Sequence, residues 1–95
     1  MKLTILQWNI LYKEKMENII RFLRKVKPDI ACLQELTVNS ELNRYKDVLA
    51  EIARALKMEY VFGIAQTQRN ANGTRVQFGN GVFSRLPIVR KYQKF

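Results

Sequence analysis

Glu35 and Asn9 are the two side chains of this sequence whose types and positions best suit chemistry. Asn9 closes an apolar segment that begins at residue 3, and Glu35 closes a second one, residues 30–33 followed by Gln34. In neighbouring parallel strands these ends would meet at the sheet edge where α/β proteins bind ligands. Mg²⁺ prefers a carboxylate oxygen, and an asparagine amide can orient that carboxylate, a metal-bound water or a phosphate oxygen. Position alone leaves the ordinary alternatives open: a solvated glutamate at a strand end and a turn-forming asparagine.

The single cysteine, Cys32, does not indicate thiol chemistry. The sequence contains no histidine that could activate it, and it lies in an apolar run, so we expect a buried structural cysteine. One cysteine forms no internal disulfide, and no signal peptide is visible, which favours a reducing, cytoplasmic location. No apolar stretch approaches the roughly 20 residues that a membrane-spanning helix needs.

The first third of the sequence predicts the elements that carry the two polar side chains. Residues 3–10 predict a strand, because β-forming residues follow one another there. Residues 13–27 predict a helix, since apolar residues recur at the i, i+3, i+4 spacing until Pro28 ends the pattern. The apolar run 30–33 predicts a central strand. Strand, helix and strand together form a βαβ unit, which makes the two strands parallel.

The rest of the sequence predicts one more helix and three more strands. Residues 41–57 predict a helix capped by Asn39 or Ser40. Its apolar face comprises Tyr45, Val48, Leu49, Ile52 and Leu56. Strands are expected at residues 60–65, 76–84 and 88–92, with a polar loop at 68–73 that contains an Asn-Gly turn signal.

Three segments carry a family resemblance. Residues 6–10 read Leu-Gln-Trp-Asn-Ile, residues 27–35 read Lys-Pro-Asp-Ile-Ala-Cys-Leu-Gln-Glu, and residues 79–88 read Gly-Asn-Gly-Val-Phe-Ser-Arg-Leu-Pro-Ile. In order and approximate spacing they resemble the motifs of the endonuclease/exonuclease/phosphatase superfamily. That superfamily groups DNase I-like nucleases, abasic-site endonucleases, messenger-RNA deadenylases, sphingomyelinases and inositol polyphosphate 5-phosphatases. The second segment is the most specific, because nine consecutive positions fit.

The resemblance implies roles for individual residues. Glu35 matches the glutamate that binds the catalytic Mg²⁺ or Mn²⁺, and Asn9 matches the asparagine beside it, which helps hold the metal and the scissile phosphate. Asn80 lies in a strand that approaches the active-site face, which makes it a weaker substrate-binding candidate; the alternative is a polar residue at a bend between two glycines. Four further residues of these segments are expected to be structural: Trp8, Ser84, Arg85 and Pro87.

The resemblance also implies a fold and a boundary. The family fold is a DNase I-like two-sheet α/β sandwich, of which residues 1–95 would supply the amino-terminal half, a mixed sheet with two helices. The family's later Gly-Asp-x-Asn and Ser-Asp-His motifs do not occur, and there is no histidine. We therefore expect a partial domain that lacks the carboxy-terminal half and is inactive by itself.

The charge bears on the substrate. Seventeen Lys and Arg against eight Asp and Glu give a net charge of +9, which favours nucleic acid as the partner. We predict an Mg²⁺-dependent phosphodiester hydrolase, most simply a nuclease. The alternative is an inositol polyphosphate or lipid phosphoester hydrolase, since a phosphorylated small molecule or lipid suits the same motifs. A further alternative is a non-catalytic basic α/β module that binds nucleic acid.

Overall fold

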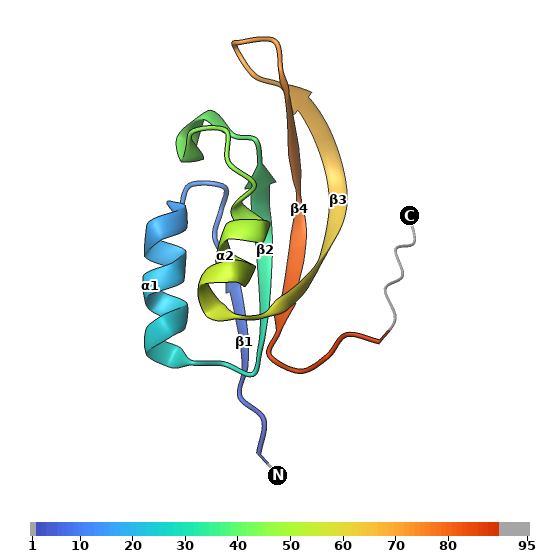
Figure 1. Ribbon diagram of the computed structural model, residues 1–95. Helices are drawn as coiled ribbons and strands as arrows, with labels where there is room; N and C mark the ends of the chain where they lie inside the picture. Colours follow the sequence, from blue (N-terminus) through green and yellow to red (C-terminus); the bar gives the residue numbers. More distant parts are fainter. Residues whose placement is uncertain (1, 90–95) are drawn as a thin grey trace.

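A single mixed sheet carries two α-helices on one face (Figure 1). The computed structural model describes residues 2–89. In chain order its elements are β1 (Ile5–Asn9), α1 (Met16–Val26), β2 (Ile30–Val38), the short 3₁₀ helix η1 (Glu41–Asn43), α2 (Val48–Leu56), β3 (Glu59–Arg69) and β4 (Arg75–Ser84). The predicted fold class, an α/β mixed sheet with two helices, is confirmed.

The inner strands of the sheet are β2 and β4. The order is β1-β2-β4-β3, with β1 parallel to β2 and β4 antiparallel to both of its neighbours. The predicted βαβ unit is therefore confirmed, with Ile5 opposite Ile30 and Asn9 opposite Gln34. As a result the carboxyl ends of β1 and β2 lie at the same end of the sheet as the β3–β4 turn (Figure 1).

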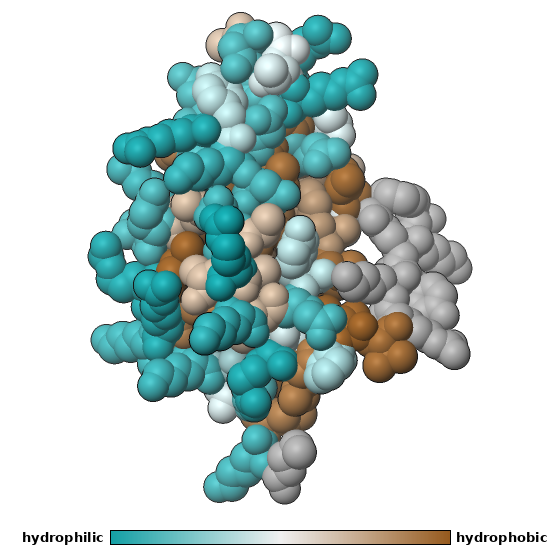
Figure 2. Space-filling view, viewed as in Figure 1, coloured by the Kyte–Doolittle hydropathy of each residue, from teal (hydrophilic) through white to brown (hydrophobic). Residues whose placement is uncertain are grey.

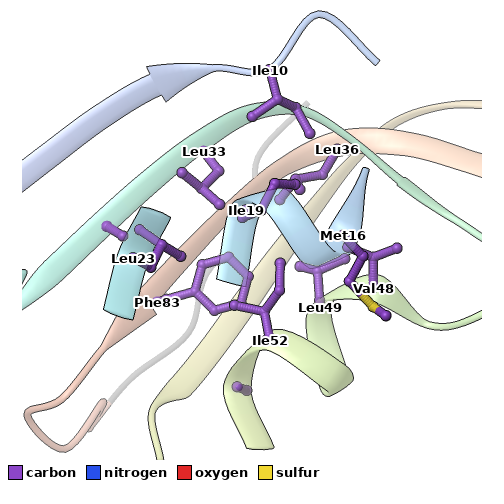
Figure 3. Packing of buried hydrophobic residues seen from close by; sticks show 12 residues of the cluster. Ile10, Met16, Ile19, Leu23, Leu33, Leu36, Val48, Leu49, Ile52 and Phe83 are labelled. Carbon is purple, nitrogen blue, oxygen red and sulfur yellow. The ribbon is translucent and has the colours of Figure 1, made fainter. Parts of the chain in front are cut away.

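The core lies between the helices and one face of the sheet (Figure 3). Ile19 and Leu23 of α1 and Leu49 and Ile52 of α2 are almost fully buried against Phe83 of β4. Burial of these apolar side chains is the main force that fixes the helices on the sheet. Trp8 also belongs to this face, since its ring lies 4.9 Å from that of Phe22 on α1, as expected for a packing residue.

Some apolar side chains of the described residues are exposed outside the core. Ile5 is 61% exposed and Val89 is 90% exposed. Figure 2 shows hydrophilic side chains over the helices and hydrophobic surface beyond β3 and towards the end of β4. Within the described residues no helix is long and apolar enough to cross a membrane.

The helix predicted over residues 41–57 is wrong as a single element. Ser40 caps only η1, where its hydroxyl accepts the N–H of Leu42, and Arg44 and Tyr45 then adopt positive φ angles of 56° and 62°. The chain restarts as α2 with Asp47 as its N-cap, whose carboxylate accepts the N–H of Ala50 at 3.1 Å. Asn43 explains the break. It is buried, and its side chain accepts the N–H of Met16 at the start of α1, so a tertiary contact overrides the local helical pattern.

The remaining differences concern strand limits. The second strand, expected over residues 30–33 with Glu35 at its end, continues past Glu35 to Val38, because residues 36–38 pair with β4. The third strand extends beyond residue 65 to Arg69, so that the turn of the hairpin is confined to residues 70–74, with Gly73 at φ +87°. The strand expected at residues 88–92 is wrong over 88–89, which follow Pro87 and form no ladder. The rest of that segment lies outside the described residues.

Asp29 and Arg85 join two of the motif segments at the end of the sheet opposite Glu35. The Asp29 carboxylate accepts the N–H of Thr4 at 2.8 Å and the Arg85 Nε–H at 3.0 Å, and it forms an ion pair with Arg85. The Arg85 N–H donates to the Asp29 carbonyl at 2.9 Å. Ser84 accepts the N–H of Leu86 nearby, so Ser84 and Arg85 have the structural roles expected of them.

We expect Asp29→Asn to destabilise the chain near neutral pH but not in acid. The Thr4 N–H, and next the Arg85 guanidinium, hold the pKa of Asp29 below its ordinary value of 3.8. A lowered folded-state pKa means that the carboxylate contributes stability above the ordinary value, and that this contribution is lost as the pH falls through the folded pKa. Urea unfolding from about pH 6 down to about pH 2 should show the gap between wild type and variant closing. Glu59→Gln, at an exposed position, should show no gap; a pH-independent gap for Asp29→Asn would contradict the assignment.

Candidate metal centre at the carboxyl ends of the first two strands

The structure brings Asn9, the last residue of β1, next to the segment of β2 that contains Glu35. Asn9 pairs with Gln34, the residue before Glu35. The chain then continues along β2, because the Ile10 N–H donates to the Gln34 carbonyl and the Tyr12 N–H donates to the Glu35 carbonyl, both at 3.2 Å. The two segments that the sequence predicted to meet are thus hydrogen-bonded neighbours.

Glu35 lies in a β-bulge of β2. Leu33 pairs with Gly81 and Leu36 pairs with Gly79, so two residues of β2, Gln34 and Glu35, stand opposite the single residue Asn80. Glu35 has a φ of 59°, a left-handed conformation that is uncommon for a residue with a side chain. Bulges of this kind re-aim side chains, and they recur beside active sites.

The bulge has a direct effect on the core. Strand alternation would place Leu33 and Leu36 on opposite faces, because they are three residues apart. The extra residue returns Leu36 to the helix side, where both leucines are fully buried. Glu35 is consequently kept out of the core and stays half-buried. This spacing of two core leucines inside a strand was a readable signal for the bulge, which the sequence analysis missed.

Asn80 touches Glu35 through the backbone. Its Oδ1 accepts the N–H of Glu35 at 3.2 Å. Gly81 lies on the helix side of β4, since a Cβ there would meet Leu36 and Leu49. Alternation therefore places Asn80 on the open face of the sheet, where its side chain is exposed. Asn9 shares that face, because its neighbour Trp8 packs towards α1. Two asparagines, one on each of the strands that pair with β2, thus flank the bulge on one face of the sheet.

The oxygen atoms of Glu35 and Asn9 differ in how free they are to bind a divalent cation. Across the described residues, the Glu35 carboxylate makes no ion pair or side-chain hydrogen bond. The Asn9 Oδ1 accepts the N–H of Leu11 at 2.9 Å, which fixes the side chain and leaves one lone pair. Residues 2–89 hold no cluster of three or more carboxylate, histidine or cysteine side chains. One carboxylate and one amide oxygen suit Mg²⁺ shared with phosphate and water, and they are too few for a closed protein cage.

An aromatic pair lies beside the bulge. The Tyr12 and Phe78 rings are 5.1 Å apart in an edge-to-face arrangement, and Tyr12 is 40% exposed. Tyr12 also donates its N–H to the Glu35 carbonyl. Tyr12 could not be identified from the sequence, because the residues around Tyr12 do not distinguish it from any other residue that follows a strand.

Basic side chains surround this end of the sheet. Six exposed cations lie on the segments that follow β1 and β2 and at the ends of β3 and β4 that flank their turn: Lys13, Lys15, Arg44, Lys46, Arg69 and Arg75. The ion pairs formed within residues 2–89, Arg54–Glu51 and Arg85–Asp29, involve none of them. Glu14, Glu41 and Asp47 share this end, but Glu14 and Asp47 already accept hydrogen bonds from Asn18 and Ala50.

Comparisons with known proteins agree on one family. A sequence profile of the Endonuclease/Exonuclease/phosphatase family matches residues 6–94. The crystal structure of an endonuclease/exonuclease/phosphatase from Beutenbergia cavernae DSM 12333 superposes with a TM-score of 0.74 at 23% sequence identity. The match covers 94% of this chain and 27% of that protein, so the chain spans about a quarter of its length. At this identity the likeness establishes the fold. No curated protein matches the chain.

Proposed function

Because the chain belongs to the endonuclease/exonuclease/phosphatase family, a family of hydrolases, we propose that Asn9 and Glu35 serve the active site of an Mg²⁺-dependent phosphodiesterase that acts on nucleic acid. The observation that carries the proposal is the bulge within β2, which holds Glu35 in a left-handed conformation next to the segment where β1 ends at Asn9. A strained residue in a bulge, next to the segment of the neighbouring strand that carries a polar side chain, is typical of a functional site.

Each residue has a role that follows from its contacts. The Glu35 carboxylate, which no described side chain neutralises, would hold the metal. The Asn9 side chain is fixed by the Leu11 N–H, and its Nδ2 has no partner within residues 2–89, so it can donate to a phosphoryl oxygen. When bound, Mg²⁺ (or Mn²⁺) supplies Lewis-acid polarisation of the phosphate and offsets the negative charge that builds up during hydrolysis.

Nucleic acid is the substrate class that the surroundings favour. Six exposed cations without ion-pair partners in the described part of the chain lie at this end of the sheet, where they can bind backbone phosphates. Tyr12 adds exposed aromatic surface beside Glu35, on which a nucleobase can stack. An inositol phosphate would use the cations but not the aromatic surface.

The 95 residues alone are not expected to turn substrate over. There is no histidine, and the described residues contain no cluster of three metal-ligating side chains. We expect a fluorogenic oligonucleotide to stay intact with Mg²⁺ present. Robust turnover that Glu35→Ala abolishes would contradict the expected inactivity, although it would support the metal role of Glu35.

Binding rather than turnover therefore tests the proposed function. Mg²⁺ should raise the affinity of the 95-residue chain for a labelled oligonucleotide by about tenfold, EDTA should reverse this, and Glu35→Gln should remove it. Glu59→Gln, an exposed carboxylate at the start of β3, serves as the matched control. Fluorescence anisotropy measures the effects of Mg²⁺, EDTA and the substitutions on the affinity. The salt concentration is held fixed, because the contribution of the cations weakens steeply as salt rises.

The same titration separates the alternatives. Oligonucleotide affinity that ignores both EDTA and Glu35→Gln would contradict a hydrolase site and indicate a non-catalytic basic module. Affinity for an inositol polyphosphate that depends on Mg²⁺ and Glu35, without such dependence for the oligonucleotide, would replace nucleic acid by a phosphorylated small molecule. The proposal requires the dependence for the oligonucleotide.

A further inference from the structure

We infer that Asn80 is a positioning residue for Glu35, which it holds through the backbone of the bulge rather than through the carboxylate. The inference rests on the proposed metal role of Glu35, and its structural part can be measured without metal. It assigns to the Asn80 side-chain oxygen a task inside the protein, whereas the motif resemblance suggested only contact with substrate.

The backbone hydrogen bonding at the bulge shows why Asn80 is needed. A bulge sets two residues of one strand against one residue of the next, so one backbone N–H loses its ladder partner. A strand N–H left without any acceptor is costly. Here Glu35 is the residue concerned, and the Asn80 Oδ1 takes the place of the missing backbone carbonyl at 3.2 Å.

This hydrogen bond also fixes the backbone conformation of Glu35. Glu35 has a φ of 59°, which its Cβ disfavours and which persists only when the surroundings impose it. Contacts from two different segments do so: Asn80 of β4 accepts the Glu35 N–H, and Tyr12, after β1, donates to the Glu35 carbonyl at 3.2 Å. The peptide groups on both sides of the Glu35 Cα are therefore clamped, and the direction of its side chain with them.

The position of Asn80 in β4, between two glycines, makes this contact possible. Gly79 and Gly81 on either side of it allow β4 to lie close to its surroundings, since a Cβ on Gly81 would come within 2.6 Å of Leu36 and one on Gly79 within 2.0 Å of the Gly63 carbonyl oxygen. Asn80 itself lies opposite the bulge in the ladder between β2 and β4, and this position brings its short side chain within reach of the Glu35 N–H. Asparagine is the right length for the task, because an alanine has no acceptor and a longer side chain would have to fold back.

The two atoms of the Asn80 amide thus serve separable purposes. Its Oδ1 is engaged by Glu35, while its Nδ2 has no partner among the residues that the structure describes. Asn80→Asp keeps an acceptor and removes the donor; Asn80→Ala removes both. If Asn80 positions Glu35, the backbone of Glu35 should keep its wild-type conformation in Asn80→Asp and lose it in Asn80→Ala. If Asn80 only contacts substrate, the two variants should not differ in this way.

The test uses the ¹⁵N-labelled 95-residue chain without metal, followed by a Mn²⁺ titration. Hydrogen exchange at the Glu35 amide should speed up about tenfold or more in Asn80→Ala and stay near the wild-type rate in Asn80→Asp. The Glu35 Cα chemical shift should leave the left-handed range only in Asn80→Ala. Asn72→Ala is the matched control, because it removes a side-chain acceptor from the Thr74 N–H in the hairpin turn without touching β2.

Mn²⁺ affinity should fall about tenfold in Asn80→Ala, as expected when a residue that orients a ligand is lost. Unchanged exchange and Cα shift at Glu35 in Asn80→Ala would overturn the inference, whatever happens to the metal. Faster exchange with unchanged Mn²⁺ affinity would overturn the positioning role. If wild type and Glu35→Gln bind Mn²⁺ equally, the proposed function fails instead, and the metal-free data still decide whether Asn80 holds the bulge.

Discussion

Gly79→Ala is expected to destabilise the chain by about 3 kcal/mol, which is a large share of the stability of a small domain. A Cβ at Gly79 would lie 2.0 Å from the backbone oxygen of Gly63, at the point where β3 has its own irregularity between Ile64 and Gln66. A backbone atom cannot move aside as a side chain can, so β3 and β4 would have to separate. Urea unfolding followed by the fluorescence of Trp8, the single tryptophan, measures the change.

Two other glycines provide graded controls. A Cβ at Gly81 would meet the side-chain ends of Leu36 at 2.6 Å and Leu49 at 2.9 Å, which can shift, so Gly81→Ala should cost about 1–2 kcal/mol. Gly73 has a φ of +87° with nothing within 4 Å of the added Cβ, so Gly73→Ala should cost about 1 kcal/mol of backbone strain alone. A Gly79 variant no less stable than the Gly73 variant would contradict the packing described for β3 and β4.

Glu35→Gln is expected to weaken divalent-metal binding by about ten- to a hundredfold. The change keeps the size of the side chain and removes the negative charge that a hard cation requires. Because Glu35 lies in a bulge outside the core, the fold should be unaffected. The free Mn²⁺ signal in electron paramagnetic resonance gives the dissociation constant directly, and Mg²⁺ competition extends the comparison to the expected metal.

Glu41→Gln is the control for this second prediction, since Glu41 is an exposed carboxylate at the same end of the sheet. Its dissociation constant should stay within about twofold of wild type, because exposed charges are well screened. Equal losses of Mn²⁺ affinity in Glu35→Gln and Glu41→Gln would mean that metal binding depends only on the net charge of this end of the sheet. That result would remove Glu35 from its assigned role.

The sequence was sufficient for the βαβ unit because its signals are local. The apolar run before Gln34, the helical spacing before Pro28 and the first strand each depend on neighbouring residues, and a right-handed crossover then makes β1 and β2 parallel. The encounter of Asn9 with the Glu35 segment follows from that topology alone. The predicted pairing of the two segments is therefore confirmed, but Glu35 does not end its strand, because β2 continues to Val38. The chemical role of both residues stays a prediction.

The features that could not be predicted depend on distant partners. The second helix was expected to start near residue 41, but Asn43 is buried against the start of α1, and the helix begins only at Val48. The contact of Asn80 with Glu35 spans 45 residues and requires the register of β2 against β4, which no local pattern fixes. The spacing of Leu33 and Leu36 indicated a bulge, yet the residue that would accept the freed N–H could be identified only from the structure.

Paramagnetic broadening of the ¹⁵N-labelled chain by substoichiometric Mn²⁺ is the decisive test of Glu35 as the metal ligand. Because the effect falls steeply with distance from the ion, it locates the metal on the chain. If Glu35 binds the metal, the amide signals of residues 9–10 and 34–36 should broaden first, and Glu35→Gln should abolish this pattern. Broadening centred on other carboxylates, or a pattern that survives in Glu35→Gln, would contradict the assignment of Glu35 as the metal ligand.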